Sequence, residues 1–145
     1  MLLTESNLVN KARDLAKQYH RGQTDKVGND YFRYHLTDVV KKLANPKEKI
    51  VGWLHDILED TEMTVEKLRE EGFPEDIIGA IVAVTKKPGE NYIAFVKRAA
   101  AHGKLAKAVK HADIEDHLDR QDRKRDFSSK ASLKKRYIKA IEFVQ

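Results

Sequence analysis

The chain has 145 residues, 35% of them charged, and a formal net charge of +5. It contains no cysteine, which excludes disulfides and thiolate-bound zinc or iron–sulfur centres. No apolar run approaches the length of a membrane-spanning helix, and the amino terminus lacks the apolar segment of a signal peptide. We therefore expect a single domain over residues 1–145, located in the cytoplasm and without a membrane partner.

Helical periodicity recurs along the chain, whereas the alternating pattern of strands is nearly absent. Apolar residues at helical spacing predict helices over residues 8–19, 36–43, 46–58, 64–72, 74–84, 92–103, 105–118 and 133–144. Asn45 before Pro46 and Thr64 are typical helix starts, and Gly72 is a typical helix end. The sequence therefore predicts a compact all-α bundle of seven or eight helices.

Two segments lack this periodicity. Residues 20–34 place two glycines and several polar residues between two expected helices, and loops of this length inside compact domains are often functional. Residues 119–130 are charged and almost without apolar side chains, so we expect a mobile loop there.

The most informative segment is the one from Trp53 to Thr61. It contains the pair His55-Asp56 and, one helical turn later, the pair Glu59-Asp60, within a run of large apolar residues. Burying three carboxylates and an imidazole is costly without cationic partners. A divalent metal ion would satisfy most of them, and imidazole with carboxylate suits manganese, iron or zinc.

Further metal ligands must come from elsewhere in the chain. His35 begins the second expected helix, and Asp113 follows Val109 by four positions and so shares its inward face. With His55 and Asp56 they offer two nitrogens and two oxygens, which leaves an octahedral ion two positions for water and a phosphate oxygen. A single histidine on an apolar face is usually only hydrogen-bonded, so the prediction depends on all four residues together.

Polar residues near this site predict the other parts of a hydrolytic reaction. Glu59 and Asp60 lie on the same side as the His-Asp pair, and we expect them to orient the attacking water and accept its proton. Lys26, in the polar loop, is the first candidate for neutralising a polyphosphate, and Lys86 is the second.

The charge of the carboxyl-terminal third also bears on the ligand. From Lys97 onward basic residues outnumber acidic ones 14 to 7. Such an excess commonly forms a solvated face, but it also attracts polyanions. Aromatic residues are not interleaved with it as stacking platforms for a nucleic-acid strand would be. We therefore expect a phosphorylated nucleotide rather than a nucleic acid.

The order of these residues resembles the HD superfamily of metal-dependent phosphohydrolases. Beyond these residues, further parts of the chain are similar to the hydrolase domain of RelA/SpoT-type proteins and their small stand-alone relatives. The similarity is carried by Gln23, Asp25-Lys26, Gly28, the segment from Leu54 to Thr61, Thr64, Val84-Thr85-Lys86 and the segment from Val109 to Asp113. The resemblance implies an all-α HD domain with one Mn²⁺ ion held by the four predicted ligands. It also implies release of pyrophosphate from the 3′ position of guanosine tetraphosphate or pentaphosphate, and, without room for a synthetase domain, hydrolysis only.

The chain departs from the family pattern at several positions, among them His111, where the family usually has leucine. The family commonly reads Tyr-x-x-His-Pro, whereas this chain has one extra residue after Tyr31 and Leu36 in place of the proline. The family usually has asparagine near the substrate sugar where this chain has His117. His117 is therefore a candidate substrate contact. Hydrolysis of another nucleotide or phosphoester and non-catalytic nucleotide binding remain as alternatives, and the sequence does not indicate an oligomeric state.

Overall fold

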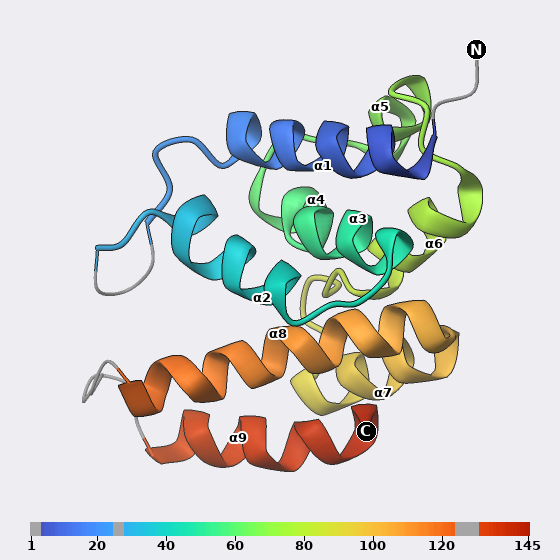
Figure 1. The fold of residues 1–145 in the computed structure, drawn as a ribbon. Helices are drawn as coiled ribbons and strands as arrows, with labels where there is room; N and C mark the ends of the chain where they lie inside the picture. Colours follow the sequence, from blue (N-terminus) through green and yellow to red (C-terminus); the bar gives the residue numbers. More distant parts are fainter. Residues whose placement is uncertain (1–3, 25–27, 124–130) are drawn as a thin grey trace.

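The computed structural model describes residues 4–24, 28–123 and 131–145 (Figure 1). These residues form helices and no β-strand, apart from an isolated bridge between Thr24 and Asp30. The predicted all-α fold is confirmed. The elements are α1 (Glu5–Tyr19), a π-helical turn η1 (Phe32–Leu36), α2 (Thr37–Lys41), α3 (Pro46–Leu54), α4 (Ile57–Asp60), α5 (Val65–Glu70), α6 (Glu75–Ala83), α7 (Tyr92–His102), α8 (Lys104–Arg123), α9 (Ala131–Ile141) and a 3₁₀ turn η2 (Glu142–Val144).

Local side chains set several of these boundaries. The backbone N–H of Glu48 donates to Oδ1 of Asn45 at 2.9 Å, and the backbone N–H of Asn45 donates to the Glu48 carboxylate at 3.4 Å. This reciprocal capping box starts α3 one residue after Asn45. Thr64 caps α5 with its hydroxyl, and Pro74 precedes the first residue of α6. The helix starts predicted at these residues are therefore confirmed.

The helix expected over residues 46–58 is wrong in one respect. α3 ends at Leu54 and α4 begins at Ile57, so His55 and Asp56 form a turn between two helices. Neighbouring side chains on an unbroken α-helix diverge by about 100°. A turn relaxes that constraint, and it allows both side chains to face the same interior space.

The loop expected over residues 119–130 is wrong for residues 119–123, which continue α8, and the remaining positions lie outside the described residues. Ion pairs hold this end of the helix. Lys42, which follows α2, lies 2.7 Å from the Asp119 carboxylate, and Nε of Arg120 donates to Asp116 at 2.7 Å. Charge along the segment therefore supports a helix instead of preventing one, because the charges have partners at the end of α2 and on α8 itself.

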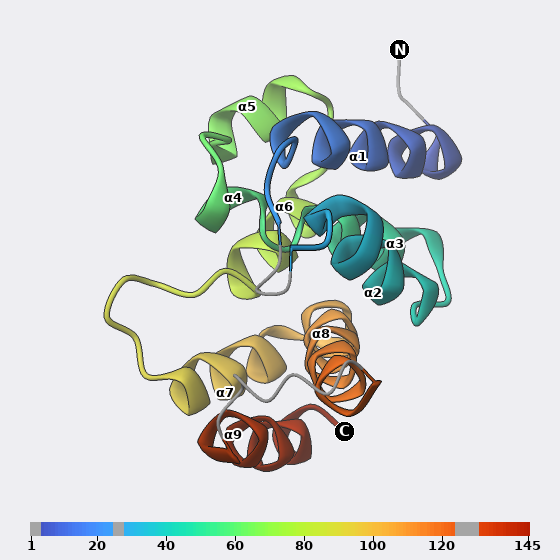
Figure 2. The ribbon, with the colours of Figure 1, turned by 90° about the vertical axis from the view of Figure 1, so that its left-hand side faces the viewer.

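α8 runs through the middle of the molecule (Figures 1 and 2). The helices α1 to α6 lie on one side of it, and α7 and α9 lie on the other. The main core contains Val109 and Ala112 of α8, whereas a second apolar cluster between α7, α8 and α9 contains Ile114. Polar side chains of α8 that lie between these two cores are thereby buried among neighbouring helices.

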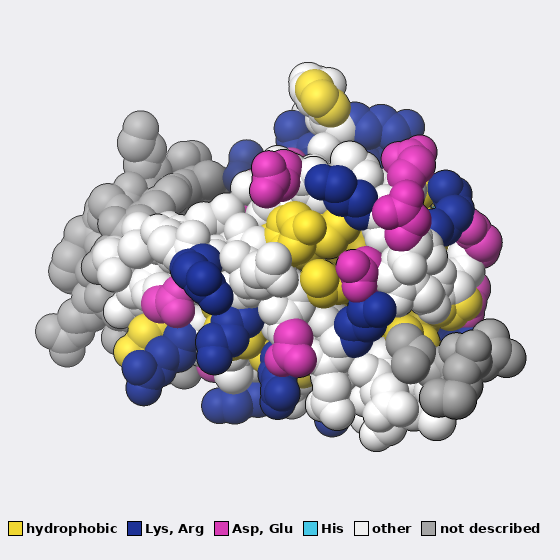
Figure 3. Space-filling view, turned by 90° about the horizontal axis from the view of Figure 1, so that it is seen from above, with side chains coloured by type: hydrophobic (Ala, Val, Ile, Leu, Met, Phe, Trp, Pro, Cys, Tyr) yellow, Lys and Arg dark blue, Asp and Glu magenta, His cyan; other side chains and the backbone are white. Residues whose placement is uncertain are grey.

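The surface over α1 and α5 mixes both signs of charge. Figure 3 shows basic and acidic side chains interspersed on this face, with no histidine visible. Lys11, for example, pairs with Glu71 at 2.9 Å. The apolar side chain of Val82 on α6 is 40% exposed. Each described helix is too short or too polar to cross a lipid bilayer.

We predict that Asn45→Ala lowers the free energy of unfolding by about 1 kcal/mol, because an N–H of α3 loses its acceptor. Urea denaturation measures this loss. Asn10→Ala, at an exposed position of α1, is the control and should change stability by less than about 0.5 kcal/mol. Equal effects of the two substitutions would contradict a stabilising capping box.

Candidate metal centre

Three of the four predicted ligands converge inside the molecule. Nε2 of His35 and Nε2 of His55 lie 3.3 Å apart, and they lie 3.2 and 3.3 Å from Oδ1 of Asp113. The three side chains come from η1, from the turn after α3 and from α8. All three residues are buried, at most 5% exposed.

Asp56 completes the set on its more open side. Its Oδ2 lies 3.1 Å from Nε2 of His55 and 3.6 Å from Nε2 of His35. The hydroxyl of Tyr31 donates to the same oxygen. The Asp56 side chain is 16% exposed, against 7% for that of Asp113. Any ligand that reaches the group from solvent therefore meets Asp56 before Asp113.

The hydrogen bonds of Nδ1 in His35 and His55 determine whether Nε2 of each ring presents a proton or a lone pair. Nδ1 of His55 lies 2.6 Å from the carbonyl oxygen of Gly52, and Nδ1 of His35 lies 2.8 Å from the Asp116 carboxylate. Both partners are acceptors, so each Nδ1 carries a proton, and each Nε2 of a neutral ring presents a lone pair. Oδ1 of Asp113 is buried and accepts no hydrogen bond. The two Nε2 atoms and Oδ1 of Asp113 are therefore acceptors that face one another. Such a group is unfavourable unless a cation binds between them.

The pKa values of the histidines and aspartates also show that this group favours positive charge. Burial opposes protonation of His55, but the Asp56 and Asp113 carboxylates outweigh it and raise the pKa of His55 to about 10. Burial likewise opposes protonation of His35, yet the nearby carboxylates of Asp113, Asp116 and Asp56 hold its pKa well above the ordinary value. In turn, the histidines help to keep the pKa values of Asp56 and Asp113 well below the ordinary value despite burial.

The spacing and the donor set fit a divalent ion. Ligand atoms about 2.0–2.2 Å from one ion lie roughly 3.0–3.5 Å apart when they occupy neighbouring positions. The four pairs between a histidine Nε2 and a carboxylate oxygen of Asp56 or Asp113 span 3.1 to 3.6 Å. Two imidazoles and two carboxylates form a mixed nitrogen and oxygen set that suits manganese, iron, cobalt or zinc.

Two buried residues that sequence reasoning missed support the ligands. Asp116, fully buried, lies between Nδ1 of His35 and the Arg120 side chain. Lys110 donates to Oδ2 of Asp113 at 2.9 Å, which leaves Oδ1 directed at the histidines. The available signal was spacing, because residues three apart on α8 share a face with Asp113.

The extra residue before His35 is absorbed by a π-helical turn. The N–H and the hydroxyl of Thr37 both donate to the carbonyl oxygen of Phe32, five residues earlier. Such a turn holds one more residue than an α-helical turn. The rings of Tyr31 and His35 remain close, with centroids 5.0 Å apart. The turn therefore keeps both side chains on the site, so the departure from the family pattern does not displace the histidine.

The acidic pair lies beside Asp56. Carboxylate oxygens of Asp56, Glu59 and Asp60 lie within 4.8 Å of one another, and the last two residues are exposed. The expectation that all four polar groups of the segment are buried is therefore wrong for this pair. Partial desolvation and the charges of Asp56 and Glu59 raise the pKa of Asp60 to about 6. Desolvation also raises the pKa of Glu59, so the pair holds protons more readily than free carboxylates do.

The polar loop is tied to this acidic pair. The side-chain amide of Gln23 donates to the carbonyl oxygen of Asp60 at 3.0 Å, and Nδ1 of the buried His20 lies 2.8 Å from the Gln23 side-chain oxygen. His20 therefore has a structural hydrogen bond and braces the loop. Lys26 lies outside the described residues.

The remaining two predicted substrate contacts lie on either side of the site. Lys86 is half-buried after α6, near enough for its charge to lower the pKa of Glu59. Arg98 holds this loop by donating to the carbonyl oxygen of Thr85 at 2.9 Å. On the other side, Nε2 of His117 lies 3.4 Å from Oδ1 of Asp113. The structure thus places His117 against the predicted ligands.

Comparison with known proteins agrees with the resemblance found in the sequence. No family model matches the chain. It is 32% identical over 111 residues to the guanosine-3′,5′-bis(diphosphate) 3′-pyrophosphohydrolase of Borreliella burgdorferi, which covers 74% of this chain and 16% of that protein. It is 37% identical over 82 residues to a GTP pyrophosphokinase of Streptomyces antibioticus, 54% of this chain and 10% of that protein. The chain thus spans less than a fifth of the length of these relatives.

The fold also has a counterpart among solved structures. A metazoan ortholog of SpoT that hydrolyses ppGpp matches with a TM-score of 0.76 at 21% identity, over 94% of this chain and 83% of that one. This chain is therefore similar to RelA/SpoT-type hydrolases in part of its sequence and in its fold. The helices on either side of its His-Asp pair therefore follow a known fold.

We predict that Mn²⁺ stabilises this HD-type domain. An ion at about 100 times its dissociation constant raises the free energy of unfolding by about 2.7 kcal/mol when it binds only the folded state. Asp56→Asn should abolish this stabilisation, and thermal unfolding with and without Mn²⁺ measures it. Asp76→Asn, which changes an exposed carboxylate on α6, should keep it. An unchanged response in Asp56→Asn would remove Asp56 from the ligand set.

We also predict that deletion of Arg33, an exposed residue of the π-helical turn, preserves the response to Mn²⁺. The turn then relaxes to an α-helical one, and Tyr31 and His35 stay on the same side. Arg33→Ala, which keeps the chain length, is the matched control. If the deletion loses the response while the substitution keeps it, the extra residue is not dispensable and the proposed role of the turn is wrong.

Proposed function

We propose that the chain is a metal-dependent phosphohydrolase that removes pyrophosphate from the 3′ position of guanosine 3′,5′-bis(diphosphate). The observation that carries this proposal is the group of buried acceptors around Oδ1 of Asp113, which accepts no hydrogen bond, with an acidic pair beside it. The names of the Borreliella burgdorferi and Spiroplasma citri relatives, the latter 36% identical over 81 residues, support this choice of substrate.

His35, His55, Asp56 and Asp113 would hold the ion, which we propose to be Mn²⁺. When bound, such an ion polarises a phosphoryl oxygen and makes water a stronger nucleophile at neutral pH. The four ligands meet this role because two of them are neutral and two are anionic, so a dication leaves the group without net charge.

Glu59 and Asp60 act on the attacking water in this proposal. Glu59 orients the water and accepts its proton, assisted by Asp60. Both carboxylates lie on the exposed side of the group, where water and substrate arrive, and their raised pKa values suit proton acceptance. The hydrolysis breaks the bond between the 3′ oxygen and its phosphorus and releases pyrophosphate and guanosine diphosphate.

Cationic side chains then neutralise the polyphosphate. We propose Lys86 for this role because it lies near Glu59 and because Arg98 fixes its loop. Lys26, three residues after the Gln23 that donates to the carbonyl oxygen of Asp60, is proposed as a second contact. We also propose that the substrate is a nucleotide and that the protein is cytoplasmic. The interspersed charges over α1 and α5 do not favour nucleic acid as a partner on that face.

His117 favours a second candidate, an HD phosphohydrolase that acts on another nucleotide or phosphoester. An imidazole 3.4 Å from Asp113 presents a different shape and charge to the substrate from the asparagine that the family resemblance implies. Non-catalytic nucleotide binding is less well supported, because a pure binding site has no need of the acidic pair beside Asp56.

We predict that Glu59→Gln lowers the rate of pyrophosphate release from guanosine 3′,5′-bis(diphosphate) by about 10²-fold or more, since a general base contributes about that factor. Its thermal stabilisation by Mn²⁺ should persist. Glu66→Gln, at an exposed position of α5, serves as control and should retain the wild-type rate. A wild-type rate in Glu59→Gln would mean that another group activates the water.

The same assay with a panel of nucleotides decides between the two candidate functions. We expect release of pyrophosphate from guanosine 3′,5′-bis(diphosphate) and little product from common nucleoside triphosphates. Release of phosphate or pyrophosphate from other nucleotides alone would transfer the proposal to the second candidate. Absence of turnover with every phosphoester, in protein that binds Mn²⁺, would instead support a binding module.

A further inference from the structure

Three imidazole nitrogens surround one buried carboxylate oxygen. Nε2 of His117 lies 3.4 Å from Oδ1 of Asp113, compared with 3.2 Å for His35 and 3.3 Å for His55. We propose that His117 is a further ligand of the metal ion, so that the centre contains three imidazoles. The inference depends on the metal centre of the proposed function and assigns one more residue to it.

The surroundings of Asp113 argue against a simple ion pair with His117. Lys110 already neutralises this carboxylate through Oδ2, at 2.9 Å. An imidazolium that paired with Oδ1 would donate a hydrogen bond to it, yet Oδ1 accepts none. The nitrogen of His117 therefore lies nearly as close to Oδ1 as the nitrogens of His35 and His55 do.

Helix α8 directs His117 to the same space as Asp113. The two residues are four positions apart on α8, which places them on one face of the helix. The ring of His117 also lies against that of His35, with centroids 5.1 Å apart. A side chain that is about a third exposed thus reaches the rim of a group whose other histidines are buried.

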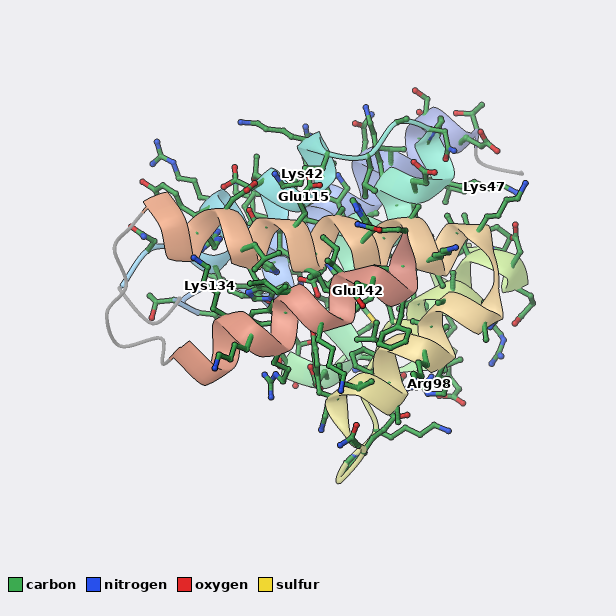
Figure 4. All side chains as sticks on the ribbon, turned by 90° about the horizontal axis from the view of Figure 1, so that it is seen from below. Lys42, Lys47, Arg98, Glu115, Lys134 and Glu142 are labelled. Atoms are coloured by element: carbon green, nitrogen blue, oxygen red, sulfur yellow. The ribbon has the colours of Figure 1, made fainter. Side chains whose placement is uncertain are left out.

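Helix α9 holds the imidazole in this position. The rings of His117 and Tyr137 stack with centroids 4.8 Å apart and an angle of 3° between their planes. Tyr137 is itself fixed by Tyr92 of α7, at 5.8 Å edge to face, and by the Arg136 guanidinium above its ring. Figure 4 shows α9 lying along α8. The stack restricts the rotamers of His117, which lowers the entropy cost of binding an ion.

A third imidazole changes the chemistry expected of the centre. It would occupy one of the two positions that four ligands leave open on an octahedral ion. One position would then remain for the phosphoryl oxygen, and Glu59 and Asp60 would hold the attacking water without the ion. Nitrogen ligands also favour cobalt, zinc and iron over magnesium. We therefore expect strong discrimination against Mg²⁺.

X-ray absorption of the Co²⁺-loaded protein tests the inference, because scattering from the outer atoms of imidazole rings counts the coordinated histidines. We expect three imidazoles in the wild type and two in His117→Ala, with Co²⁺ affinity at least 10-fold weaker in the variant. His111→Ala, which removes another partly exposed histidine of α8, should keep three imidazoles and wild-type affinity.

A second variant separates ligation from folding. Tyr137→Leu removes the stacked ring but not the ligand, so it should retain three imidazoles with a smaller loss of affinity. Two imidazoles in both the wild type and His117→Ala would overturn this inference while leaving the four-ligand centre intact. Failure of the wild-type protein to bind Co²⁺ or Mn²⁺ at all would overturn the proposed function as well.

Discussion

The interaction on which this structure depends is the meeting of hydrogen-bond acceptors inside a protein. Nε2 of His35, Nε2 of His55 and Oδ1 of Asp113 lie 3.2 to 3.3 Å apart, and groups behind them fix the face that each one presents. Gly52 and Asp116 accept the outer protons of the histidines, and Lys110 occupies the second oxygen of Asp113. Such an arrangement is unfavourable without positive charge at its centre. Protons or a dication can provide that charge, and the donor set suits the dication.

The fold meets this requirement with a few local irregularities and one buried helix. A π-helical turn carries His35, and a break between α3 and α4 carries His55 and Asp56. The π-helical turn accommodates an extra residue while Tyr31 and His35 stay close, and the break places His55 and Asp56 outside a regular helix. α8 lies between two apolar clusters, so Asp113 and Asp116 are desolvated while their partners remain within reach. π-helical turns and helix breaks of this kind are common at functional sites.

The fold is that of the metazoan SpoT ortholog, yet this chain differs from the pattern of the RelA/SpoT-type hydrolases at the rim of the site. The chain spans 16% of the Borreliella burgdorferi relative but 83% of the metazoan SpoT ortholog structure, so it corresponds to one unit of the longer proteins. The imidazole of His117, stacked on α9, lies where the family pattern implies an amide. Differences in metal preference or substrate choice within the group would originate at such a position, because it is the side chain nearest Asp113 that is also reached by solvent.

Helical class, most helix starts and the identity of the polar residues that meet at the site were all present in the sequence by itself. Helix periodicity and capping are local properties, so Asn45, Thr64 and the apolar spacing were sufficient to predict them. Only the tertiary structure decided four further features. These are the break at His55-Asp56, the exposure of Glu59 and Asp60, the support from Asp116 and Lys110, and the stacking of α9 on His117. Each of these depends on how helices that are distant along the chain pack together, and packing distances are not encoded in any local pattern of residues.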